Sequence, residues 1–376
     1  MKNHIAILAI IALTAASCVS QFTPEISSQS KFLTVNGLIT DENRQYTIRL
    51  GLSKPLDETA DEELARGAQV RVRDDLGNTW SFRETKPGIY QSDSTQFIGQ
   101  PGQSYTLLIS HGGKEYVSPP CLLRKSTPID SIGYEVTDRE LNVSGQTEKI
   151  VRVMLNTYDP SSTNHYFRWT YDETWEMYLP FNNIPYENRV CWKHEESHNI
   201  LVANTEALSE DRITDLTVTT FNNSTDRGQL KYSMLVKQFA TSREEYEYWN
   251  SVKIMTENTG GLYDVTPVPV AGNITCITDP EETVLGFFSV SGVTTRRIFL
   301  RNPLIVPDMY RAECIDEVIN ADPRLPGLGT VYFIIHIYDN DDVPDVWELT
   351  VNKGCLDCGS FASKIRPDYW DEGFNK

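Results

Sequence analysis

The chain has 376 residues and a formal net charge of −18, and its basic residues never form a run longer than two. This acidic excess excludes nucleic acid and anionic membrane surfaces as main partners, because phosphate groups attract clusters of Lys and Arg. The length allows two domains, each with its own core.

The first eighteen residues have the pattern of a bacterial lipoprotein signal. Lys2 precedes an apolar run from Ile5 to Ala16, and Ser17 leads into Cys18. The run is too short to span a membrane, which needs about 20 apolar residues, and it is typical of a secretory signal. We expect residues 1–17 to be removed and Cys18 to be acylated, so that lipid anchors the protein. An ordinary signal with an incidental cysteine is the alternative.

Residues 18–30 are polar and predict a tether between the lipid and the folded part. Short segments with apolar residues at a period of two begin at Phe32 and predict strands. Residues 74–78, Asp-Asp-Leu-Gly-Asn, predict a hairpin turn, because these residue types tolerate left-handed backbone conformations. Pro-Gly and Gly-Gly pairs separate further strands. The spacing predicts a β-sandwich over residues 31–118.

Prolines at positions 119, 120 and 128 predict a domain boundary, since proline cannot donate to a strand ladder. We expect a larger β-rich domain over residues 129–376. Its aromatic residues Phe167, Trp169 and Tyr171 alternate along one strand face, which is either a stacking platform for a sugar or peptide or, more often, a core face. The apolar run at residues 331–338 predicts a central strand.

One helix is predicted near residues 242–258. Ser242 and Glu245 have the spacing of a capping box, and two glycines at 260 and 261 predict the end of the helix. The apolar positions between them recur at helical spacing and predict packing on a sheet: Tyr246, Trp249, Val252 and Met255. The predicted fold class is therefore mostly β with one prominent α-helix.

Residues 194–198, His-Glu-Glu-Ser-His, fit the H-E-x-x-H zinc motif. On a helix, His194 and His198 would bind Zn²⁺ from one face, and Glu195 would act as the general base. The surrounding residues argue against a helix, because they lack a long apolar stripe at helical spacing and continue into a strand-like segment at 200–202. We expect a non-catalytic protein without metal or cofactor, and a zinc-dependent hydrolase is the alternative.

Six cysteines follow Cys18, and an even number in an exported protein predicts disulfides whose pairing stays open. They are Cys121, Cys191, Cys276, Cys314, Cys355 and Cys358. The last two have the spacing of redox and zinc motifs, but no helix start follows them and no second Cys-x-x-Cys pair exists. We expect them to tie the C-terminal tail to earlier cysteines such as Cys314 or Cys276.

Short motifs in a fixed order across the mature chain are similar to one family. In chain order they are residues 33–40 (LTVNGLIT), Gly67-Ala68 with the hairpin after it, residues 128–131, Cys191-Trp192, Tyr246, Trp249, residues 260–264, Gly272-Asn273, residues 284–288, Cys355-x-Asp357-Cys358 and residues 367–370. The sequence resembles the lipoproteins of the Bacteroidota classed as domain-of-unknown-function family 4249.

The resemblance implies an outer-membrane lipoprotein, anchored through Cys18 and facing outward. It also implies an accessory or ligand-capturing role beside a TonB-dependent β-barrel transporter, with no established catalysis. Residues 19–22 lack the acidic side chains that favour export to the outer face, so the periplasmic face is the alternative orientation. The N-terminal sandwich is also similar to Ig-like domains and to the regulatory domains of carboxypeptidases, although likeness of fold gives no function. A purely structural envelope protein is the remaining rival.

Overall fold

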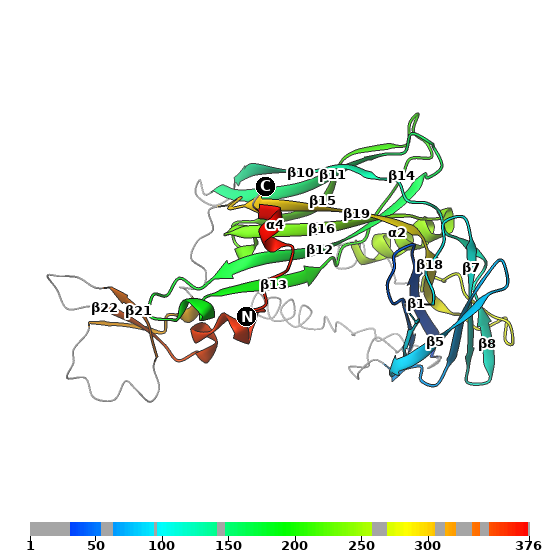
Figure 1. Cartoon of the computed structure of the whole chain (residues 1–376), viewed down its shortest axis with the longest axis horizontal. Helices are drawn as coiled ribbons and strands as arrows, with labels where there is room; N and C mark the ends of the chain where they lie inside the picture. Colours follow the sequence, from blue (N-terminus) through cyan, green and yellow to red (C-terminus); the bar gives the residue numbers. More distant parts are fainter. Residues whose placement is uncertain are drawn as a thin grey trace, which may run out of the picture.

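A computed structural model describes residues 31–53, 63–93, 96–140, 147–257, 269–304, 313–320, 333–338 and 346–374. Cys18, with the predicted signal and tether, lies outside these residues. Within them the chain is mostly β and has one helix longer than six residues, as the sequence predicts. Its sheets are arranged along an elongated molecule (Figure 1).

The first sandwich is one sheet that folds over on itself. Its strands from this part of the chain are β1 (Leu33–Ile39), β2 (Thr47–Leu52), β3 (Glu63–Leu64), β4 (Gln69–Asp74), β5 (Thr79–Lys86), β6 (Ile89–Gln91), β7 (Ser104–His111), β8 (Lys114–Val117) and β9 (Cys121–Leu122). The first half of β5 pairs with β4 and its second half pairs with β6. The sheet therefore curls around a core that includes Val35, Ile48, Val72 and Leu107.

The hairpin turn between β4 and β5 forms as predicted. Gly77 has a φ of +92°, which is the left-handed region that glycine adopts without strain. The Asp74 carboxylate accepts hydrogen bonds from the backbone N–H of Asn78 at 2.7 Å and of Leu76 at 3.1 Å. This local network fixes the start of β5, next to Trp80, which is important for the site described below.

Two strands from much later in the chain complete the first sandwich. Strand β18 (Leu285–Val290) runs parallel to β1, and β17 (Thr275–Cys276) pairs antiparallel with β8. Ile274, Val284 and Phe288 are buried in the core of the first sandwich. The division drawn from the sequence placed this segment in the second domain, and the structure corrects it. Parallel pairing needs a long crossover, and here the intervening chain includes most of the second sandwich.

The second sandwich packs a three-stranded sheet on a five-stranded sheet. The first is ordered β10 (Ile129–Glu140), β11 (Thr147–Tyr158), β15 (Arg212–Asn222), and the second is ordered β13 (Val190–Glu196), β12 (Tyr166–Tyr178), β16 (Lys231–Ala240), β19 (Gly292–Arg301), with β14 (Leu201–Asn204) beside β12. Phe167, Trp169 and Tyr171 are each at most 4% exposed and pack in the core between the sheets. They form a core face and not a stacking platform.

Helix α2 (Arg243–Glu257) lies where the two sandwiches meet (Figure 1). Tyr246 packs on Tyr166 of β12, and Tyr248 packs on Phe287 of β18. The helix therefore contacts both sandwiches. The Ser242 hydroxyl accepts the Glu245 N–H at 3.2 Å, so the first half of the predicted capping box is confirmed. The second half is wrong, because the Glu245 carboxylate is bonded to β12 and Ser291.

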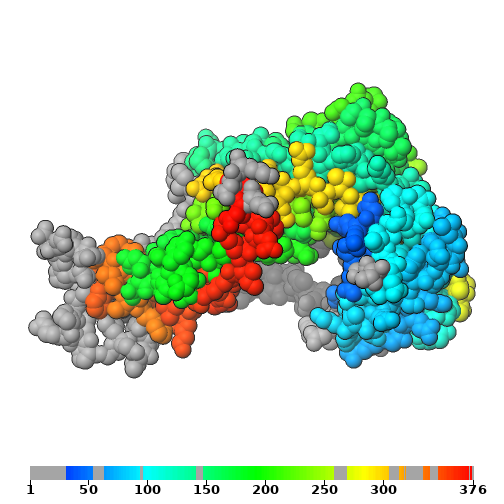
Figure 2. Space-filling model, viewed as in Figure 1, coloured from blue at the N-terminus to red at the C-terminus, as the bar shows by residue number. Residues whose placement is uncertain are grey.

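The C-terminal part forms a small sheet and a returning tail. The sheet is ordered β20 (Glu317–Asn320), β22 (Val346–Thr350), β21 (Phe333–Tyr338), so within the described residues β21 is an edge strand and not the predicted central one. The tail contains 3₁₀ helices η4 (Lys353–Leu356) and η5 (Cys358–Ser360) and the short helix α4 (Trp370–Phe374). Its Trp370 is buried and donates to Glu176 of β12 at 3.0 Å. Figure 2 shows this segment, in red, lying across the second sandwich.

Candidate functional site

The H-E-x-x-H residues lie on a strand and not on a helix. His194 and Glu195 belong to β13, with His194 opposite Thr174 of β12, and His198 follows the end of the strand. On a helix, positions i and i+4 lie on one face, whereas residues four apart along an extended strand are separated by about 13 Å. The strand therefore does not provide the shared helical face on which the motif depends. Among the described residues, no group of three His, Cys, Asp or Glu side chains could hold a metal. The geometry required by the zinc motif is therefore not formed here.

Glu195 is instead part of an ion-pair network. Its carboxylate pairs with Arg227 of η2 (Asp226–Gly228), whose Nε also lies 3.7 Å from the carboxylate of the buried Glu173. Tyr232 donates to Glu173 at 2.7 Å. Burial raises the pKa of Glu173, which the Tyr232 hydrogen bond and the Arg227 charge partly offset. Arg227 thus links two glutamates that lie on neighbouring strands.

Four of the six cysteines form disulfides that hold the C-terminal tail: Cys191–Cys358 and Cys314–Cys355. The predicted tie between the tail and Cys314 is confirmed. The suggested tie to Cys276 is wrong, because Cys276 is carried into the first sandwich by β17, where it is buried and free. Cys121 is also free, and burial raises the pKa of its thiol to about 12, which keeps it protonated and unreactive.

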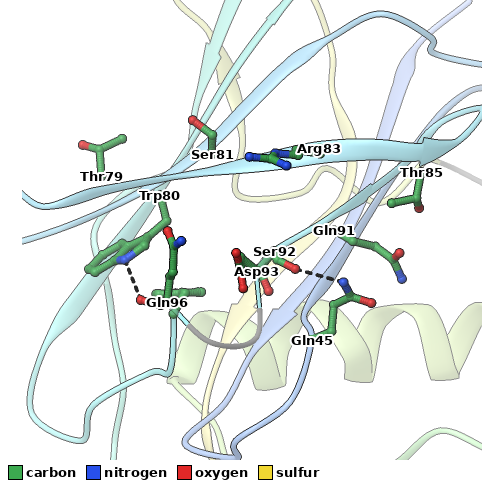
Figure 3. Close-up of a pocket in the computed structure, with 11 residues that line it drawn as sticks. Gln45, Thr79, Trp80, Ser81, Arg83, Thr85, Gln91, Ser92, Asp93 and Gln96 are labelled. Atoms are coloured by element: carbon green, nitrogen blue, oxygen red, sulfur yellow. Dashed lines mark hydrogen bonds between the residues drawn. The ribbon is translucent and has the colours of Figure 1, made fainter.

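A polar cavity of about 440 Å³ lies in the first sandwich, between β5 on one side and residues 91–93, Gln96 and Phe97 on the other (Figure 3). It exists because β5 changes partners. Residues 79–82 pair with β4, and the pairing with β6 begins only at Arg83. The other edge of residues 79–82 has no strand beside it among the described residues, and the cavity occupies that corner.

Trp80 stands between this cavity and a second depression of about 370 Å³, because both are lined by Trp80 and Gln96. We call the two depressions together the Trp80 groove. The indole packs on the buried Phe97 with ring centroids 4.7 Å apart, and its N–H donates to the Gln96 carbonyl at 3.0 Å. These two contacts hold Trp80 in one position while part of its surface borders both depressions.

The groove is rich in carboxamide side chains. Its walls contain Gln45, Asn78, Gln91, Gln96, Gln100 and Gln103. Most are oriented by one hydrogen bond, as when Gln45 donates to the Ser92 carbonyl at 3.1 Å. The Gln96 side chain makes no hydrogen bond within the described part of the chain. An amide has two N–H donors and an oxygen acceptor, so each of these groups keeps free capacity for a ligand.

Two charges face the first cavity from different walls, Arg83 on β5 and Asp93 after β6 (Figure 3). Arg83 has no ion pair among the described residues. The groove thus offers hydrogen-bond donors and acceptors beside one fixed aromatic surface. Binding sites for small ligands combine these groups.

Sequence reasoning left the ligand-binding residues unassigned and treated this region as turns between strands. A signal was present, because Gln occurs at 91, 96, 100 and 103, within the thirteen residues from the last position of β6 to the one before β7. In the parts of the chain that the structure describes, no helix is both long and apolar enough to cross a membrane.

Comparison with protein families matches residues 19–297 to the family described as "Domain of unknown function (DUF4249)". The match covers most of the chain and ends within β19, so it includes the first sandwich, its returning strands and helix α2. Comparison with curated proteins finds no match.

Proposed function

Because the chain belongs to the DUF4249 family, we propose that it is a lipid-anchored, non-catalytic binding protein of the outer membrane that works as an accessory of a TonB-dependent transporter. The anchor is the lipid on Cys18, at the end of a lipoprotein-like signal. With a net charge of −18 the polypeptide is repelled by anionic lipid head groups, so attachment depends on acylation.

The observation that carries the binding role is the Trp80 groove. It combines a positioned indole with oriented amides at the surface of the first sandwich. Ligand sites of this kind are concave, largely formed before the ligand arrives and equipped with a few directed polar groups. The accessory role, the transporter partner and the outward orientation are supported by the signal pattern and by the resemblance described above.

Affinity purification from the native bacterium tests the accessory role. The tagged full chain is purified from detergent-solubilised outer membranes, and co-purifying proteins are identified by mass spectrometry. We expect a β-barrel transporter in near-stoichiometric amount. The matched control is Cys18→Ala, which should leave the outer-membrane fraction and lose the transporter. Absence of any transporter beside a membrane-bound wild-type chain contradicts the accessory role and favours a purely structural envelope protein.

Orientation is tested separately on intact cells. A protease added outside should cleave the anchored chain if it faces outward, while a periplasmic marker protein stays intact. Protection of the chain until the outer membrane is permeabilised would place it on the periplasmic face.

A further inference from the structure

We propose that the Trp80 groove binds a neutral oligosaccharide, with Trp80 stacking on one sugar ring and the surrounding carboxamides hydrogen-bonding the hydroxyl groups of that ring and its neighbours. This inference rests on the proposed binding function and names its ligand class.

The amides match the chemistry of sugar hydroxyls. A hydroxyl donates one hydrogen bond and accepts two, and a carboxamide both donates and accepts. Gln91 is held by its bond to Thr47 at 3.3 Å, and Gln103 accepts from the Tyr105 hydroxyl at 3.0 Å. Each therefore presents its remaining donors or acceptors in a fixed direction. Such oriented amides reduce the entropy cost of binding a ligand with many hydroxyls.

The indole supplies the apolar part of the contact. A pyranose ring carries C–H groups on its faces, and an aromatic ring can bury such a surface. Trp80 is fixed from behind by Phe97, which itself contacts Tyr46, Phe82 and Tyr105 in the core. Since the indole borders both depressions, a sugar seated on it would place the adjoining units in the cavities of about 440 and 370 Å³. The ligand is therefore a chain of sugars and not a single unit.

The charges in the groove favour a neutral ligand. Arg83 and Asp93 line the first cavity with opposite charges, so its lining has no excess charge. In the second depression the carboxylate of Asp74 is already bonded to two backbone N–H groups and to the Asn78 amide. The chain as a whole is strongly acidic, which disfavours a polyanionic ligand.

An extended peptide is the competing ligand, because the edge of residues 79–82 has no strand beside it in the described structure. A peptide bound there would add a strand and would need pockets for alternate side chains. The space beside that edge is instead lined by Gln45, Gln91 and Gln96 (Figure 3). This lining favours hydroxyl groups over apolar side chains.

The test uses the full chain purified in detergent and a panel of neutral β- and α-linked glucans, mannans, xylans and galactans of two to six units. Binding is measured by isothermal titration calorimetry. We expect at least one member to bind, and Trp80→Ala to weaken binding about tenfold, which corresponds to about 1.4 kcal/mol for the lost stacking contact.

Trp80 also packs on the core, so Gln96→Ala serves as a second variant that leaves the fold intact. Gln96 is exposed, and loss of its hydrogen bonds should weaken binding about fivefold. The matched control is Gln69→Ala, an exposed amide on β4 outside the groove, which should bind like the wild type.

The failures are distinguishable. If no sugar binds while the transporter still co-purifies, the ligand class is wrong and the accessory role stands. If sugars bind but Trp80→Ala and Gln96→Ala have no effect, the assigned site is wrong. If a random peptide pool binds at the groove and no sugar does, the peptide reading replaces this one. If the wild type binds a sugar, both variants lose that binding and no transporter co-purifies, the sugar-binding inference is supported. Only the accessory role is then contradicted.

Discussion

Arg168 of β12 and Glu245 of helix α2 form a buried ion pair, with Nε and Oε1 3.3 Å apart and the two side chains 11% and 2% exposed. The other carboxylate oxygen of Glu245 accepts from Ser291, which lies between β18 and β19. The Arg168 guanidinium lies over the rings of Phe239 and Trp249. One carboxylate thus connects the helix to the second sandwich and to the point where the chain leaves the first.

Glu245→Gln should lower the free energy of unfolding by about 3 kcal/mol, because it leaves the Arg168 charge buried without a counter-charge. Urea denaturation measures the change. The control is Glu247→Gln on the exposed side of the same helix, where the side chain is 62% exposed and the expected change is under about 0.5 kcal/mol. Equal effects of the two variants would show that the buried pair does not hold the helix in place.

The same helix shows what the sequence can and cannot predict. Ser242 accepts the Glu245 N–H as expected, since a cap depends on residues three positions apart. The carboxylate of Glu245 instead meets Arg168, which is 77 positions earlier in the chain. The turn at 74–78 and the short strands were predictable for the same local reason. The return of β18 to pair with β1 was not, because no periodicity records a partner about 250 positions away.

The candidate sites also depend on contacts between residues that are distant in the sequence. The spacing of His194 and His198 has its zinc-binding meaning only on a helix, and pairing with β12 makes this segment a strand. The Trp80 groove depends on a change of partner along β5 and on Gln45 from a distant loop. The recurrence of Gln in residues 91–103 was visible, but nothing local placed those amides beside Trp80.

Arg227→Met should lower the free energy of unfolding by about 3 kcal/mol. The substitution keeps the aliphatic bulk but removes the charge that faces the carboxylates of Glu173 and Glu195. Glu195→Gln should cost less than about 1 kcal/mol, because that side chain is 44% exposed. Chemical denaturation of both variants measures the two free energies of unfolding. Equal losses would contradict the central role of Arg227.

The double variant Arg227→Met/Glu173→Gln provides the control. A neutral amide at 173 can still accept from Tyr232, so the double variant should recover much of the lost stability. If it is no more stable than Arg227→Met alone, the uncompensated charge of the buried Glu173 is not the reason for the loss.

The disulfides predict a thiol count. The denatured, unreduced chain with Cys18→Ala should contain two free thiols, at Cys121 and Cys276. Titration with a thiol reagent measures the number, and peptide mass spectrometry without reduction identifies the pairs. Four free thiols, or a peptide joining Cys276 to the tail, would contradict the assigned pairing.

The Cys191–Cys358 bridge spans 167 positions and should have a large effect on stability. Its removal in the variant Cys191→Ser/Cys358→Ser should lower the free energy of unfolding by about 4 kcal/mol, because a long loop is released in the unfolded chain. Cys121→Ala is the control, with an expected change below about 1 kcal/mol. A reductant should lower the melting temperature of the wild type and of Cys121→Ala, because both contain this bridge. The decrease should be smaller in the double variant, which has already lost it.

Asp159 makes the free energy of unfolding depend on pH in the acid range. Burial raises the pKa of its carboxyl, but hydrogen bonds from Ser161, Asn164 and Thr163 outweigh that effect and lower the pKa to about 2. The backbone N–H groups of Ser161 and Asn164 each donate to it at 2.9 Å. The ordinary value in an unfolded chain is about 3.9. The folded state therefore binds the proton more weakly than the unfolded state does.

The sign of the pH dependence follows from this difference. A folded-state pKa below the unfolded value contributes stability above about pH 4, and this contribution is lost as the pH falls from about 4 to about 2. The loss is about 2 kcal/mol for a shift of this size. In Asp159→Asn the free energy of unfolding should fall less steeply over that range, by about this amount. Asp130→Asn, at an exposed position on β10, should keep the wild-type slope. Parallel curves for the wild type and Asp159→Asn would rule out the Asp159 network as the source.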